Sequence, residues 1–286
     1  MLQQVDTFVG PEVNWFALSP MLTLLGGTLV LMLAGALTPK WPKGLYAFAT
    51  ATIAGTAAVL AMVQWDDITD EGTRTLVAGV IAYDTLSMFM TITICVGVIL
   101  VAMISDEYLR DTPNDGPEIY ALYLVAAIGG IVMASANDLI VLFLGLETLS
   151  LALYVLASSN RRSSESAESG IKYFVLGGFA SAFFLYGIAL VYGATGTTNI
   201  SEMVAALQNG VDPFGNESLA LAGIALLIVG LGFKVAAVPF HVWAPDVYQG
   251  APTPVTAFMA SVGKAAAFVA MLRVLVIALP FYRDDW

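Results

Sequence analysis

Four charged side chains lie inside stretches of this chain that are otherwise apolar enough to cross a lipid bilayer. They are one glutamate and three lysines: Glu147, Lys172, Lys234 and Lys264. An ionised side chain at mid-membrane costs about 2.5–3.5 kcal/mol even on the lenient insertion scale. Such residues therefore face the interior of a helix bundle and commonly serve ion or proton pathways. The sequence predicts a membrane bundle with charged groups inside it.

About eight segments have the length and hydropathy of a transmembrane helix, which needs roughly twenty apolar residues. They cover residues 17–37, 45–64, 81–104, 119–136, 138–157, 170–193, 218–248 and 254–279. Hydrophobic residues make up 58% of the chain and charged residues 12%, and the mean hydropathy is +0.82. The predicted fold is all-α, a polytopic transmembrane helix bundle.

Polar connectors are expected between these spans. Two of them are the acidic run Asp66–Glu71 and the serine-rich run Ser158–Ser169. A longer connector, Thr197–Glu217, contains an amphipathic stretch around Ile200–Leu207 that could lie along the membrane interface.

Charge and cysteine content exclude several classes of function. The formal net charge of −11 argues against a nucleic-acid partner. One cysteine, Cys95, and one histidine leave no framework for a disulfide, zinc, haem or an iron–sulfur cluster. We expect no metal and no cofactor on this chain.

The basic residues of the connectors predict the orientation, because Lys and Arg in short loops stay on the cytoplasmic side. If the N-terminus lies outside, five basic residues fall in inner loops and two in outer segments. The inner set is Lys40, Lys43, Arg110, Arg161 and Arg162, and the outer set is Arg74 and Arg283. Both termini are therefore predicted to lie outside.

Glu147 and Lys264 each lie about ten residues into a predicted span, which at 1.5 Å per residue is near the bilayer midplane. Glu147 requires a partner or a proton there. A structural hydrogen bond between helices is the alternative reading for Glu147, and a fixed ion pair is the alternative for Lys264. A lysine withdrawn from water exchanges its proton more readily near neutral pH, so both residues are candidates for proton transfer.

Lys234 stands five residues before Pro239, which cannot donate a hydrogen bond to the carbonyl of Val235. We therefore expect the seventh span to be broken. Broken helices at membrane depth line protein-covered or water-filled cavities, and in transporters they mark the ion site. The alternative is a simple proline kink with Lys234 reaching the nearer interface.

Other charged residues are weaker candidates. Lys172 lies near the start of its predicted helix, so extension toward the inner surface competes with pairing to Glu147. His241 could relay a proton at physiological pH or make a structural hydrogen bond. Arg273 is expected to extend from the last span to the surface. Asp84 and Asp138 are expected to cap helices.

A continuous segment carries a resemblance that composition alone does not. Residues 233–255 read FKVAAVPFHVWAPDVYQGAPTPV and resemble the signature of the antiporter-like subunits of respiratory complex I. Residues 256–266, TAFMASVGKAA, and 146–156, LETLSLALYVL, are most similar to its subunit N. The first three helices match only in hydropathy and order.

The resemblance implies a proton-translocating membrane module of NADH:quinone oxidoreductase, in the bacterial inner membrane. It implies that NADH, quinone, FMN and iron–sulfur clusters are used by other subunits. Its implied partners are other membrane-arm subunits, including adjacent antiporter-like ones, together with lipid, protons and water. In that family Glu147 would pair with Lys172 and Lys234, and Lys264 would pass protons toward the membrane centre.

The resemblance also implies a division of the chain. Residues 1–118 would form three N-terminal helices, and residues 119–286 would form the first antiporter-like repeat of five helices. Family members continue through a second, inverted repeat, so we expect this chain to correspond to an N-terminal portion. Two other readings are a subunit of a multisubunit cation/proton antiporter and a non-conducting scaffold.

Overall fold

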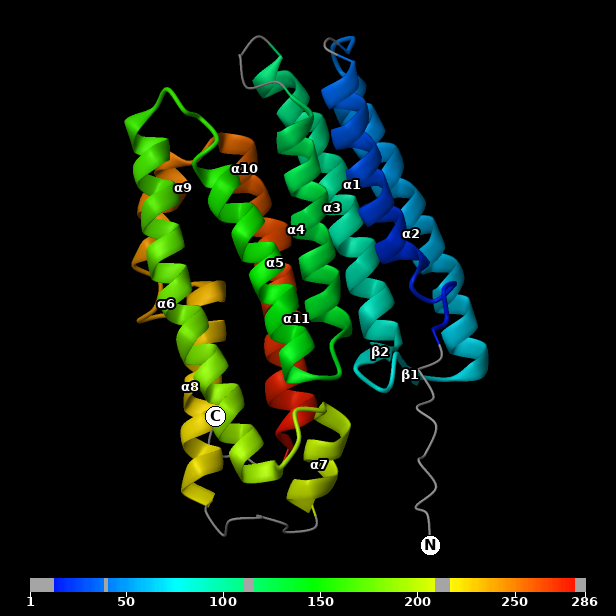
Figure 1. The fold of residues 1–286 in the computed structure, drawn as a ribbon, viewed down its shortest axis with the longest axis vertical. Coiled ribbons are helices and arrows are strands. Elements are labelled where there is room, and N and C mark those ends of the chain that lie inside the picture. The colour runs from blue at the N-terminus through cyan, green and yellow to red at the C-terminus, as the bar shows by residue number, and fades with distance from the viewer. Residues whose placement is uncertain (1–12, 39–40, 111–115, 209–216, 281–286) are drawn as a thin grey trace, which may run out of the picture.

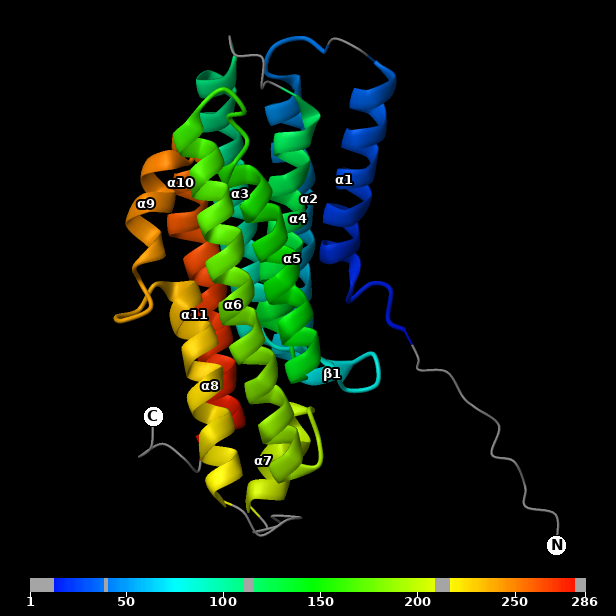
Figure 2. The same cartoon turned by 60° about the vertical axis from the view of Figure 1, so that its left-hand side comes forward.

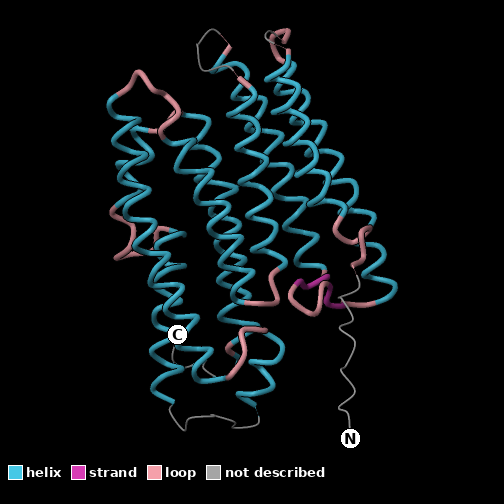
Figure 3. Tube along the Cα trace, viewed as in Figure 1, coloured by secondary structure: helices cyan, strands magenta, loops and turns pink. Residues whose placement is uncertain are grey.

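The computed structural model describes residues 13–38, 41–110, 116–208 and 217–280. Long helices run side by side in one bundle, with a β-hairpin and a short helix at one end (Figures 1 and 3). The helices are α1 Ser19–Leu37, α2 Leu45–Glu71, α3 Thr85–Leu109, α4 Pro117–Ser135, α5 Leu139–Ala157, α6 Ser164–Thr195, α7 Ile200–Gln208, α8 Glu217–Val235, α9 Trp243–Gly250, α10 Thr253–Phe258 and α11 Lys264–Met271. Strands β1 Arg74–Leu76 and β2 Ile81–Tyr83 pair antiparallel.

The predicted membrane spans are confirmed. Within the described residues, eight helices are long and apolar enough to cross a bilayer. Seven of them are α1–α6 and α8, and the eighth is the continuous run Thr253–Ala278. That run includes the π-helical segments Met259–Gly263 and Leu272–Ala278 on either side of α11. Figure 2 shows α1 at one side of the bundle and α9 with α10 at the opposite side.

The predicted break in the seventh span is also confirmed. Helix α8 ends at Val235, and the chain becomes helical again only at Trp243. Ala236 adopts a left-handed φ of 58°, a conformation that commonly ends helices. Lys234 is therefore held in the last turn of α8, directly before the break.

Two predicted connectors are partly helical in the structure. The acidic run Asp66–Glu71 belongs to α2, and Arg74 forms ion pairs with Asp67 at 2.6 Å and Glu71 at 2.7 Å. Helix α6 begins at Ser164, where the Ser163 hydroxyl accepts a hydrogen bond from the amide of Ser166. A hydropathy window finds only the apolar part of a helix, so polar turns beyond the lipid were assigned to loops.

The third span begins later than predicted, because Ile81–Tyr83 is a strand. Asp84 then caps α3 by accepting a hydrogen bond from the amide of Ser87 at 2.7 Å. Asp138 caps α5 in the same way, with bonds from the amides of Ile140 and Val141. Both capping predictions are confirmed.

The C-terminal ends of α1, α3 and α5 and the N-terminal ends of α2, α4 and α6, with the described residues beside them, lie at one end of the bundle, and the β-hairpin and α7 lie at the other (Figure 1). The first set contains Lys43, Arg110, Arg161 and Arg162, whereas Arg74 lies in the β-hairpin. Lys40 and Arg283 fall outside the described residues. The two predicted groups of basic residues are thus separated along the bundle axis.

Helices α4 and α5 pack closely at a pair of glycines. A Cβ atom added to Gly129 would lie 2.7 Å from the carbonyl oxygen of Gly145. A Cβ atom added to Gly145 would lie 2.8 Å from the amide nitrogen of Met133. Small residues let helix backbones approach in this way in membranes. The contact holds α5, which carries Glu147, tightly against α4.

Candidate functional site

Lys234 is enclosed by side chains from three helices. Its side chain on α8 is only 6% exposed. The ammonium donates hydrogen bonds to the hydroxyl of Ser150 on α5 at 2.8 Å and to the hydroxyl of Tyr173 on α6 at 3.1 Å. It also lies 5.3 Å from the ring centre of Tyr173 and 5.9 Å from that of Tyr154. The simple kink with a surface-reaching lysine is therefore not what the structure shows.

Glu147 lies one turn before Ser150 on α5 and is half-buried. Its carboxylate accepts a hydrogen bond from the hydroxyl of Ser181 on α6. Ser150, Ser181 and Lys234 line one small internal pocket. No direct ion pair joins Glu147 to Lys234 in the described part of the chain, but the two charges interact electrostatically. Glu147 and Lys234 each bond a different serine hydroxyl, and both serines line the same pocket.

Lys172 occupies a different place from the one implied by the resemblance. It lies eight residues after the first residue of α6, with its side chain 41% exposed. Its ammonium forms ion pairs with Glu168 at 2.7 Å and with Asp246 of α9 at 2.6 Å. The expected pairing with Glu147 is not formed, because the acidic side chains nearest to Lys172 come from its own helix and from α9. The contact joins α6 to the second half of the broken helix.

Lys264 follows the π-helical turn Met259–Gly263 and is half-buried. Within the described residues its amine makes no hydrogen bond and no ion pair, and it lies 5.7 Å from the ring centre of Tyr248. A fixed structural ion pair for Lys264 is thus not observed there. His241 is exposed in the break, and its side chain has no hydrogen bond to any of the lysines. Its role as a relay stays a prediction.

A series of aromatic contacts runs from the ring beside Lys234 to the ring beside Lys264. The Trp243 ring stacks on Tyr173 with centroids 4.6 Å apart and on Phe233 with centroids 5.2 Å apart. Tyr248 meets the same Trp243 edge-on at 5.9 Å. The indole N–H of Trp243 donates to the carbonyl of Phe233 at 3.0 Å, which fixes the start of α9 against the end of α8.

Several polar residues of this site were missed in the sequence. Ser150 and Tyr173 bond Lys234 across 84 and 61 residues of chain, and Ser181 bonds Glu147 across 34. Serine and tyrosine are common within membrane helices, so neither residue type is a signal by itself. Only the packing of α5, α6 and α8 brings them to the charged groups.

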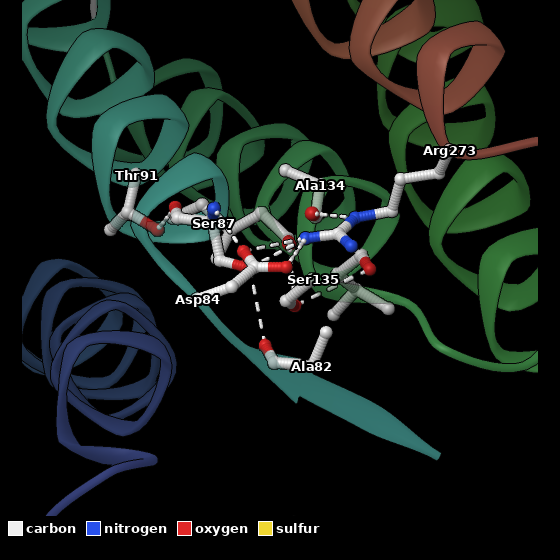
Figure 4. Close-up of polar contacts among 9 residues, drawn as sticks. Ala82, Asp84, Ser87, Thr91, Ala134, Ser135 and Arg273 are labelled. Carbon is white, nitrogen blue, oxygen red and sulfur yellow. Dashed lines mark hydrogen bonds and ion pairs between the residues drawn. The ribbon is translucent and has the colours of Figure 1, made fainter. Parts of the chain in front are cut away.

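The prediction for Arg273 was wrong. Its side chain is buried, with the residue 2% exposed, and points to the start of α3 rather than to the surface (Figure 4). One terminal nitrogen donates to both carboxylate oxygens of Asp84 at 2.9 Å and to the Ser87 hydroxyl at 2.8 Å. The Nε group donates to the carbonyl of Ala134 at the end of α4. The guanidinium group therefore pairs with Asp84, 189 residues away in the chain, instead of reaching water at the membrane surface.

Comparisons with known proteins agree on one family. A family model described as "NADH:quinone oxidoreductase/Mrp antiporter, TM" matches residues 136–286. NADH-quinone oxidoreductase subunit N 2 from Koribacter versatilis is 41% identical over 272 residues, covering 94% of this chain and 54% of that protein. This chain thus spans about half the length of the curated relatives it matches.

Solved structures show the same arrangement of helices. A chain of respiratory complex I from Thermus thermophilus, with bound aureothin, superposes with a TM-score of 0.73 at 37% identity. The match covers 89% of this chain and 52% of that one. A chain of the Mrp complex from Dietzia sp. superposes with a TM-score of 0.75 at 22% identity, over 93% of this chain and 49% of that one. The likeness to the Mrp complex shows the fold alone.

Proposed function

The chain belongs to the NADH:quinone oxidoreductase/Mrp antiporter family of membrane subunits, and on this premise we propose that it translocates protons as part of complex I. The resemblance to the antiporter-like subunits, and to subunit N among them, is confirmed. The proposal concerns what these helices do: Glu147, Lys234 and Lys264 form a proton relay completed by water. NADH oxidation and quinone reduction take place on other subunits.

The observation that carries the proposal is the enclosure of Lys234. A buried ammonium with only two neutral hydroxyl partners is poised to change its protonation state, because burial disfavours the charged form. Glu147 lies one turn before Ser150 on α5, and a nearby negative charge favours the protonated form of a lysine. A charge change near Glu147 would therefore change the proton affinity of Lys234.

The electrostatic interaction between Glu147 and Lys234 is large enough to control whether Lys234 keeps or releases its proton. Two unit charges several ångströms apart, at an effective dielectric constant of about 20, interact by a few kcal/mol, and ~1.4 kcal/mol corresponds to a tenfold change in proton affinity. In the proposed cycle a charge change arriving from a neighbouring subunit weakens the Glu147–Lys234 interaction. Lys234 then releases its proton toward Lys264.

The proposal includes a location and partners. The chain is placed in the bacterial inner membrane with its N-terminus outside, so that the loops carrying Lys43, Arg110 and Arg161 face the cytoplasm. Other membrane-arm subunits, including antiporter-like ones, would lie beside it. Residues 1–118 and 119–286 would act as a three-helix unit and a five-helix repeat, the second of which carries the relay.

Proton uptake into inverted membrane vesicles, driven by NADH in the assembled complex, tests the role of Lys234. Lys234→Ala should lower proton uptake while the complex still assembles. Lys234→Arg should also lower it, because arginine keeps the positive charge but does not release its proton. Lys43→Ala, which changes an exposed loop lysine, is the matched control. Assembled Lys234 variants with a normal ratio of protons moved to NADH oxidised would rule the role out.

A further inference from the structure

Two polar groups between the broken helix and the eighth span have no hydrogen-bond partner in the described residues. The Tyr248 hydroxyl is buried and unpaired. The Lys264 amine makes no hydrogen bond or ion pair and lies 5.7 Å from the Tyr248 ring centre. Leaving a buried polar group unpaired costs about 1–3 kcal/mol, so such a group commonly indicates bound water. A water molecule bonded to the Tyr248 hydroxyl would supply the partner that this buried group lacks, at the ring beside which the half-buried Lys264 amine lies.

Tyr248 also belongs to the aromatic cluster that packs beside Lys234. Tyr173, which accepts the hydrogen bond from Lys234, and Tyr248 contact the same indole ring of Trp243. The backbone carbonyl of Tyr248 accepts a bond from the Thr256 hydroxyl at 3.1 Å, which ties α9 to α10 at the start of the eighth span. Tyr248 is thus fixed between the two lysines.

We propose that the Tyr248 hydroxyl is a proton-carrying group of the relay, connecting the Lys234–Tyr173 pair to Lys264 through water. This inference rests on the proposed function, and it adds a residue to which neither the charge pattern nor the family resemblance assigned a role. Trp243 contacts both Tyr173 and Tyr248, and its one polar atom, Nε1, is already bonded to the Phe233 carbonyl, so the Tyr248 hydroxyl is the polar group of this cluster that is left to carry a proton.

The transfer balances without any other reactant. The Lys234 ammonium gives a proton to the Tyr173 oxygen while the Tyr173 O–H gives its own proton to a water molecule, and that water gives a proton to the Tyr248 oxygen. The Tyr248 hydroxyl passes a proton to a water molecule by the same exchange, and that water protonates the neutral Lys264 amine. Each hydroxyl forms one O–H bond and breaks another, so both phenols end unchanged, and rotation about the C–O bonds resets them.

The test replaces Tyr248 by phenylalanine in the complete subunit within the assembled complex. Because the hydroxyl has no protein partner among the described residues, its removal should leave assembly and thermal stability unchanged. Tyr248→Phe should lower NADH-driven proton uptake into inverted vesicles by at least half as much as Lys264→Ala lowers it. Tyr186→Phe, the same chemical change at a side chain that is 60% exposed, should leave uptake at the wild-type level.

The outcomes separate this inference from the proposed function. If Lys264→Ala lowers proton uptake and Tyr248→Phe does not, the relay stands and Tyr248 has no part in it. If neither variant lowers uptake, the proposed function itself fails. If Tyr248→Phe lowers the thermal stability of the complex together with uptake, a packing role for the hydroxyl replaces the proton-carrying role.

Discussion

Replacing Asp84 by asparagine is expected to destabilise the bundle far more than the change of one atom suggests. Asparagine caps helices as well as aspartate does, so the hydrogen bond from the Ser87 amide is preserved. The change removes the negative charge opposite Arg273 and replaces one of the two oxygens that accept its hydrogen bonds by an NH2 group. Arginine does not become neutral in proteins, and this one is 2% exposed. A buried positive charge is therefore left without its counter-charge.

The magnitude follows from the contacts of Arg273. Removing one partner of a buried ion pair costs about 3–5 kcal/mol. The lower end applies here, because the side-chain oxygen of the introduced asparagine still accepts one of the two bonds and Ser87 and Ala134 keep theirs. We expect a loss of about 3 kcal/mol in the free energy of unfolding. The double variant Asp84→Asn with Arg273→Met should recover most of this loss, since no charge is stranded.

Detergent-titrated unfolding of the full-length subunit measures these differences as a double-mutant cycle. Asp138→Asn is the matched control, because Asp138 caps α5 and bonds Thr198 but pairs with no cation among the described residues. Its cost should be small. Equal losses for Asp84→Asn and Asp138→Asn would refute the reasoning, as would a double variant no more stable than Asp84→Asn alone.

Two further changes test packing and pairing. Gly129→Leu should abolish assembly of the complex on native gels, because the leucine side chain would collide with the α5 backbone. Gly178→Leu is the control and should assemble normally, because no atom lies within 4 Å of a Cβ added at Gly178. Lys172→Met should change stability little, because both side chains of its ion pair with Asp246 are largely exposed. It should also lower proton uptake less than Lys234→Ala does, and an equal loss of uptake would show that Lys172 is a relay member.

The features that sequence reasoning predicted are those set by local sequence. Span positions depend on about twenty consecutive residues, and the break depends on Pro239 and its neighbours. The position of Arg273 near the end of its span predicts that its side chain reaches the membrane surface. Its actual partner, Asp84, caps a different helix, and nothing in the sequence near Arg273 indicates that contact. The pairing of Lys172 with Asp246 was missed for the same reason. A three-residue strand such as β2 is too short for an alternating pattern to reveal it.

Helix α4 serves as a common support for two of the three proposed proton carriers. The glycine contact anchors α5, with Glu147, to one side of α4, and Arg273 anchors the helix of Lys264 to the carbonyl end of α4. Lys234 instead ends a helix that packs chiefly on α6 and stops at a break. Glu147 and Lys264 are therefore both held against α4, whereas Lys234 is held at the end of α8, next to the break. A change in the distance from Lys234 to the other two carriers would therefore require the end of α8 to shift, while Glu147 and Lys264 keep their common support on α4.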